Sequence, residues 1–198
     1  MLEMKNIIAI ISFAIIVIIS VPYIKDIVKR RVRPERISWL LWTLLGATYL
    51  VGAIKTDGAV IVLLADFLVT AITFILVLKF GVGGKSWFDK ISLSIALLAF
   101  ILMLALNDGP IYGLALAIFV DLIGSILTIR KLRRDPASER KYYWGMLVIS
   151  ELLAVASLNV YSVENLLFPV YAVIINTIIF CFIKKKAPKS AEKAIEKF

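Results

Sequence analysis

Long apolar runs alternate with short polar segments along the chain, and each run is close to the length of a membrane-spanning helix. A bilayer core about 30 Å thick needs about 20 predominantly apolar residues per helix. Clusters of turn-forming residues at 55–58, 81–84 and 107–110 separate several of the runs. The pattern predicts an all-α integral membrane protein with seven transmembrane helices, at Ile7–Ile24, Ile37–Ile54, Gly58–Leu78, Ile91–Leu106, Ile111–Ile129, Tyr142–Leu158 and Leu166–Ile183.

Composition supports the membrane interpretation and disfavours metal binding and catalysis. Hydrophobic residues make up 61% of the 198 residues and charged residues 19%, whereas about a quarter of a typical soluble domain is charged. The chain has no histidine, the commonest metal ligand and neutral-pH general base, and a single cysteine. The polar segments are too short to hold a soluble catalytic domain. We therefore expect no enzymatic activity, no cofactor and no metal site.

The basic residues predict how the helices are oriented. Of the 23 Lys and Arg residues, 21 fall on alternate polar segments, and only Lys5 and Lys55 fall on the others. The positive-inside rule puts the basic segments in the cytoplasm, with the N-terminus outside and the C-terminus inside. Only an odd number of spans gives this result. The net charge of +9 then predicts attraction to an anionic inner leaflet and not nucleic-acid binding.

The four tryptophans, Trp39, Trp42, Trp87 and Trp144, lie at the predicted cytoplasmic ends of spans or in a cytoplasmic segment. Indole rings favour the headgroup region of a bilayer, because one edge is polar and the rest is apolar. We expect all four rings to lie at that depth.

The sequence contains a weak internal repeat. A shift of 105 residues places the first, second and third spans on the fifth, sixth and seventh, and it pairs Trp39 with Trp144. This pairing predicts one membrane domain built from two three-helix units, residues 1–80 and 110–185, joined by a linker helix within 81–109 and followed by a basic tail, 186–198. One span between two three-span units makes the units parallel, which is a known transporter plan.

Two stretches carry a resemblance to a known family. One is the run Val21-Pro22-Tyr23-Ile24-Lys25, which is followed by a basic segment and continues to Trp42, and the other is the run Asp121–Glu139. With the predicted arrangement of three, one and three helices, they resemble the PQ-loop repeat superfamily, which includes the SWEET and SemiSWEET sugar facilitators, cystinosin and the KDEL receptors. A prokaryotic branch is the closer likeness, which implies a location in the cell membrane.

The resemblance implies alternating access between the two units, with Pro22 as a hinge candidate. The chain also departs from the family. Tyr23 stands where the motif has glutamine, and only Asn176 matches a pair of pocket asparagines that sugar transporters carry, since Ala71 stands opposite it under the shift. The solute is therefore left open between a sugar, an amino acid and an amine.

Three acidic residues, Asp66, Asp121 and Glu151, lie inside predicted spans, and no Lys or Arg does. A charged carboxylate near the bilayer centre costs a few kcal/mol even on lenient scales, so such residues face the protein interior. Two interpretations remain open. The acids are either neutral groups that donate structural hydrogen bonds, or sites for a proton, a cation or a cationic solute.

Helical spacing groups these acids with other polar residues. Thr70 stands four residues after Asp66, and Ser125 stands four residues after Asp121, so each pair shares one helix face. Small and hydroxyl residues also line ordinary interfaces between membrane helices. We favour a polar cavity, with Asp66, Asp121 and Glu151 as proton, cation or amine sites and Tyr49, Thr70 and Asn176 as neutral hydrogen-bonding groups.

The sequence thus predicts a small-solute transporter that is complete as a monomer and possesses no catalytic residues. A membrane receptor or interaction protein on the same fold is the alternative, and lipid handling is a third interpretation. A transporter needs its site to be reachable from both faces of the membrane, whereas a receptor needs only one.

Overall fold

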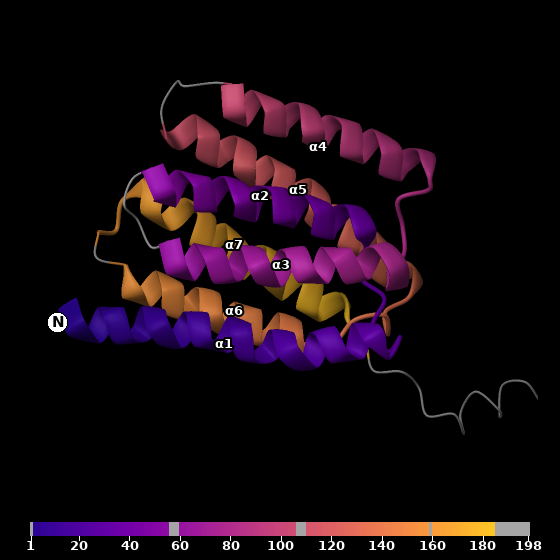
Figure 1. Cartoon of the computed structure of the whole chain (residues 1–198), viewed down its shortest axis with the longest axis horizontal. Coiled ribbons are helices and arrows are strands. Elements are labelled where there is room, and N and C mark those ends of the chain that lie inside the picture. The colour runs from indigo at the N-terminus through magenta and orange to yellow at the C-terminus, as the bar shows by residue number, and fades with distance from the viewer. Residues whose placement is uncertain (1, 56–59, 106–109, 159, 185–198) are drawn as a thin grey trace, which may run out of the picture.

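The computed structural model describes residues 2–55, 60–105, 110–158 and 160–184, which form seven helices (Figure 1). Each helix overlaps one predicted segment over most of its length. The turn residues 56–58 and 107–109 and the basic tail 186–198 lie outside the described residues. The helices are α1 (Leu2–Val28), α2 (Arg36–Lys55), α3 (Val60–Phe80), α4 (Trp87–Ala105), α5 (Pro110–Arg134), α6 (Lys141–Ser157) and α7 (Val163–Phe182).

The helices have the length, composition and outer surface of a membrane protein. Four helical segments are long and apolar enough to cross a bilayer: Met4–Val28, Trp87–Ala105, Ile111–Arg134 and Asn165–Phe182. Large aliphatic side chains such as Ile18, Ile75 and Leu98 are 68%, 65% and 59% exposed, as a surface that faces lipid tails allows. The prediction of a helical membrane protein is confirmed in this form. Seven spans, their orientation and the 3+1+3 arrangement stay predictions.

The helices pack in a regular set of pairs. Contacts join α1 with α3 and α6, α2 with α3 and α5, and α7 with α5 and α6, whereas α4 packs at the edge on α5 and, more weakly, on α2 (Figure 1). The shift of 105 residues exchanges α1–α3 with α5–α7, α2–α3 with α6–α7, and α1–α6 with α5–α2. Each contact outside α4 therefore has a counterpart under the shift.

One end of the bundle collects the basic segments. The C-terminal ends of α1, α3, α5 and α7 meet the N-terminal ends of α2, α4 and α6 there. We call this end, with segments 29–35, 81–86 and 135–140, the basic end. The segments are joined by main-chain hydrogen bonds, from Val82 N–H to the Pro34 carbonyl (2.9 Å) and from Arg33 N–H to the Ser138 carbonyl (2.9 Å).

The four tryptophans differ in exposure, and their depth in a bilayer stays a prediction. Trp39 and Trp144 are 3% and 2% exposed and belong to a buried cluster, with Trp42 packed against it, whereas Trp87 is 78% exposed. The indoles of Trp39, Trp42 and Trp144 pack edge to face, with ring centroids 5.3 Å apart for Trp39 and Trp42 and 5.9 Å apart for Trp42 and Trp144. These three rings therefore pack on one another within the protein, whatever their depth in the bilayer.

Two glycines lie where neighbouring helices approach each other, and a Cβ atom at either position would be in ordinary van der Waals contact. A Cβ atom on Gly46 of α2 would lie 3.6 Å from the Phe67 Cα of α3, and one on Gly124 of α5 would lie 3.5 Å from the Ser38 Cα of α2. Pro22 lies within α1, which continues to Val28. Its role as a hinge stays a prediction.

The packing of α1 on α6 can be tested by cross-linking. The hydroxyl oxygens of Ser12 and Ser150 lie 3.0 Å apart in the buried interface. We expect Ser12→Cys with Ser150→Cys to form a disulfide on mild oxidation in a Cys181→Ser background, detected by mass spectrometry. The control pair, Ser12→Cys with Ser94→Cys on α4, should remain reduced. Equal oxidation of both pairs would contradict the packing.

Candidate functional site

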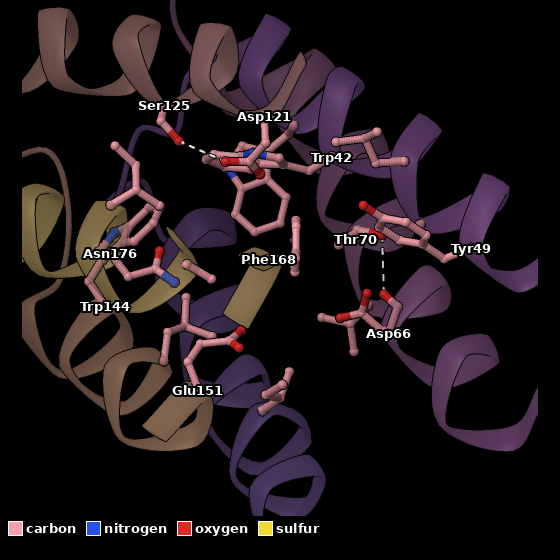
Figure 2. A pocket seen from close by; sticks show the side chains of 18 of the residues that line it. Trp42, Tyr49, Asp66, Thr70, Asp121, Ser125, Trp144, Glu151, Phe168 and Asn176 are labelled. Atoms are coloured by element: carbon pink, nitrogen blue, oxygen red, sulfur yellow. Dashed lines mark hydrogen bonds between the residues drawn. The ribbon is translucent and has the colours of Figure 1, made fainter. Parts of the chain in front are cut away.

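An interior cavity of about 260 Å³ lies among α1, α2, α3, α5, α6 and α7. All six residues that the sequence singled out as solute or proton ligands line it, and they come from five helices (Figure 2). These residues are Tyr49 on α2, Asp66 and Thr70 on α3, Asp121 on α5, Glu151 on α6 and Asn176 on α7. The cavity therefore lies among helices from both halves of the sequence.

The three acids have different surroundings. The Asp121 carboxylate accepts hydrogen bonds from the Tyr171 hydroxyl (2.7 Å) and from the Ser125 hydroxyl (3.3 Å). The carboxylates of Asp66 and Glu151 receive no hydrogen bond from the described residues, and Figure 2 shows them on opposite sides of the central space. Asp121 is thus held in place, whereas Asp66 and Glu151 are free to take a partner from the cavity.

Aromatic rings form much of the wall. Trp42, Trp144 and Tyr143 lie toward the basic end, and Tyr49 and Phe168 meet edge to face toward the opposite end, with centroids 5.8 Å apart. The Tyr49 hydroxyl oxygen is buried and has no hydrogen-bond partner among the described residues. Tyr49 is the one ring of this wall among the predicted site residues. The pairing of Trp39 with Trp144 under the shift was a signal for the others.

Other polar residues on the same helix faces serve packing. The Thr128 hydroxyl donates to Ser38 (2.9 Å) on α2, and the Ser150 hydroxyl donates to the Ser12 carbonyl (2.8 Å) on α1. The Thr73 hydroxyl donates to the Val69 carbonyl (2.8 Å) of its own helix. Thr128 and Ser150 thus hydrogen-bond between helices, and Thr73 bonds within its own helix. None of the three lines the cavity.

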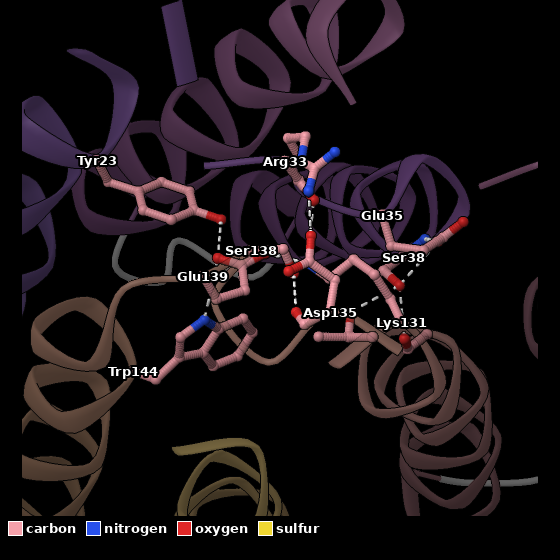
Figure 3. Close-up of polar contacts among 11 residues, drawn as sticks. Tyr23, Arg33, Glu35, Ser38, Lys131, Asp135, Ser138, Glu139 and Trp144 are labelled. Carbon is pink, nitrogen blue, oxygen red and sulfur yellow. Dashed lines mark hydrogen bonds and ion pairs between the residues drawn. The ribbon is translucent and has the colours of Figure 1, made fainter. Parts of the chain in front are cut away.

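A buried polar network lies beyond the aromatic wall, at the basic end (Figure 3). The Tyr23 hydroxyl of α1 donates to the Glu139 carboxylate (2.9 Å), and Lys131 of α5 forms an ion pair with the same carboxylate. Lys131 also donates to the Arg33 carbonyl (3.2 Å). The side chains of Lys131 and Glu139 are 7% and 1% exposed, so both charges are compensated inside the protein.

Glu35 is a second buried acid of this end. Its carboxylate accepts the Ser38 N–H (2.6 Å), and the Ser38 hydroxyl in turn donates to the Gly124 carbonyl (2.6 Å) of α5. The other carboxylate oxygen is buried without a partner among the described residues. Burial raises the pKa of Glu35 above its usual range, and the hydrogen bonds from Ser38 oppose that shift only in part.

Among the described residues, three of the four further ion pairs have their charged atoms within 3 Å of each other and surround this network. Arg33 pairs with Asp135, Arg140 with Asp26 (2.8 Å) and Arg130 with Asp89 (2.7 Å). The first two join the segment around the end of α1 to the segment between α5 and α6. We call these pairs, with the contacts of Glu139 and Ser38, the basic-end network. The sequence predicts the basic residues of this network only as charges that attract anionic lipid, and the acids of the network are not among the predicted site residues.

Comparison of the chain with protein-family models, with curated proteins and with solved structures gives no match. The resemblance to the PQ-loop proteins therefore stays a prediction from the sequence. The geometry favours binding of a polar or cationic solute, because the cavity offers acids, hydroxyls and an amide. Among the described residues, no three acidic or cysteine side chains lie close enough to hold a metal ion.

The buried ion pair gives a prediction for stability. Glu139→Ala leaves the Lys131 ammonium buried without its partner, which should cost about 3–5 kcal/mol of unfolding free energy. Tyr23→Phe removes one hydrogen bond to Glu139 and should cost about 1 kcal/mol. Equilibrium unfolding in detergent micelles measures both changes. The network would carry little stability if the two substitutions had equal, small effects.

Glu35 gives a prediction for pH. Because its folded-state pKa is raised, the ionised carboxylate lowers the stability of the folded protein, and this cost vanishes as the pH falls toward the ordinary glutamate value of about 4.3. Glu35→Gln retains an acceptor for Ser38 without the charge. We expect its melting temperature relative to the unsubstituted protein to rise between about pH 4 and about pH 8. A constant difference would show that Glu35 does not titrate in this range.

Proposed function

We propose that this chain is a membrane transporter of small solutes, of the PQ-loop or SWEET-like type, that works by alternating access. The observation that carries the proposal is the cavity, in which acids from α3, α5 and α6 face one another inside the bundle. Repeat-built transporters hold their solute near the middle of the membrane, between the repeats. In this scheme the described residues of a single chain enclose the site, so a monomer is sufficient.

The pairing of the helices supports two moving units. In the proposed arrangement, α1, α2 and α3 form one bundle and α5, α6 and α7 the other, and α4 links them at the edge. The contacts between the bundles are α1 with α6 and α2 with α5, which the shift of 105 residues exchanges. Rocking of one bundle against the other would open one end of the cavity and close the other.

The two ends of the cavity are closed unequally, which supports a gate at the basic end. The basic-end network ties the bundles together there through the ion pairs Arg33–Asp135 and Arg140–Asp26 and the buried hydrogen bond from Tyr23 to Glu139. Away from the basic end, the described residues join the bundles by hydrogen bonds without an ion pair, from the Lys5 ammonium to the Leu158 carbonyl (2.5 Å) and between the hydroxyls of Ser12 and Ser150 (3.0 Å). If the basic end is cytoplasmic, the structure corresponds to a state closed toward the cytoplasm.

Accessibility of the cavity from each face tests the proposal. Leu147 of α6 lines the cavity without forming a polar contact to it, so Leu147→Cys in a Cys181→Ser background reports on access. A membrane-impermeant maleimide should label this cysteine in both right-side-out and inverted vesicles. Labelling from a single side would instead favour a receptor on the same fold.

A cross-link tests the gate in the same vesicles. Arg33→Cys with Asp135→Cys replaces a surface ion pair by a disulfide that holds the basic end closed. After oxidation, labelling of Leu147→Cys from the basic end should fall at least about tenfold, and reduction should restore it, whereas labelling from the opposite end should persist. Unchanged labelling from the basic end would place the gate elsewhere.

A further inference from the structure

The charge around the cavity is unbalanced. Three carboxyl groups line it, and no Lys or Arg does among the described lining residues. The nearest cations of α5, Arg130 and Lys131, are engaged by acids of the basic-end network. A solute with a positive charge would meet partners here, whereas a solute carrying a carboxylate or phosphate would bury that group without a cation beside it.

The carboxyl groups stand apart around the space. Asp66 and Glu151 project from α3 and α6 on opposite sides, and Asp121 lies on a third side with its own partners (Figure 2). This spacing does not give the compact shell of oxygen ligands that Ca²⁺ or Mg²⁺ requires. A larger cation, with its charge spread over several atoms, suits separated carboxylates.

The walls also suit an organic cation. The faces and edges of Trp42 and Trp144 meet at 5.9 Å beside the cavity, and Tyr49 and Phe168 form a second aromatic pair. Aromatic faces attract ammonium groups, more strongly when water is excluded. The buried Tyr49 hydroxyl has no partner among the described residues and is a further group to which a hydroxyl or N–H of the solute can hydrogen-bond.

We infer that the solute of this cavity is a small organic cation, an amine or a quaternary ammonium compound that carries no anionic group. This inference rests on the proposed function and narrows it, because it excludes sugars and zwitterionic amino acids as preferred solutes. The cavity volume of about 260 Å³ is below the range of drug-sized sites and limits the solute to a small molecule.

Matched probes test this inference by equilibrium binding. Choline, its neutral isostere 3,3-dimethylbutan-1-ol and its carboxylate analogue betaine share a similar bulk but differ in charge. We expect choline to bind at least about tenfold more tightly than either of the others. Butylamine and butan-1-ol repeat the comparison for a primary amine. Calorimetry on the full chain in nanodiscs measures the affinities, and tryptophan fluorescence in a Trp87→Phe background reports on the cavity.

Substitutions assign the binding to the cavity. Asp66→Asn and Glu151→Gln remove a charge and retain the shape, and each should weaken binding of the cation at least about tenfold while leaving the neutral isostere unaffected. Ser94→Ala, on the exposed face of α4, is the control and should bind as the unsubstituted protein does. Thermal unfolding of each variant separates loss of binding from loss of fold.

The outcomes are distinct. Preference for choline or butylamine that is lost in the acid variants supports the inference. Equal affinity for cation and neutral isostere, preference for betaine, or no binding of either cation would overturn it, as would an equal response to NaCl or KCl alone. The binding experiment does not require access from both sides, so the transport proposal can fail in the labelling experiment while this inference stands, and the reverse also holds.

Discussion

Uncompensated carboxyl groups inside an apolar helix bundle impose the constraint on which the rest of this structure depends. Asp66, Asp121 and Glu151 have no Lys or Arg beside them among the described residues, so facing lipid would cost several kcal/mol. The helices instead turn these groups toward one interior space. Gly46 lies where α2 meets α3, and Gly124 lies where α5 meets α2.

At the basic end, unlike at the cavity, buried acidic and basic side chains lie together. Its buried Lys131 and Glu139 form an ion pair, and its segments 29–35, 81–86 and 135–140 are joined by main-chain hydrogen bonds. Such a network stabilises a single arrangement only while each partner stays in place. Ion pairs thus link acids and bases at the basic end, whereas the described residues that line the cavity include three acids and no Lys or Arg.

The sequence predicts the helices and much of the cavity because both depend on local patterns. Span length places the helices, and the spacing of Asp66 with Thr70 places both on one face. Trp39 and Trp144 show what the sequence does not predict. It gives their positions along the helices, but the direction in which the rings point depends on partners far away in the chain. The Tyr23–Glu139 bond joins residues 116 positions apart, and nothing local predicts it.

The central claim is that the two bundles separate at the basic end when the cavity opens there. Lys79 at the end of α3 and Lys184 after α7 are exposed residues of that end and are exchanged by the 105-residue shift. Spin labels on Lys79→Cys and Lys184→Cys in a Cys181→Ser background, in nanodiscs, measure the distance between them by electron paramagnetic resonance. The account predicts two distance populations, the shorter of which is enriched by cross-linking positions 33 and 135. A single distance that solute and cross-link leave unchanged would contradict it.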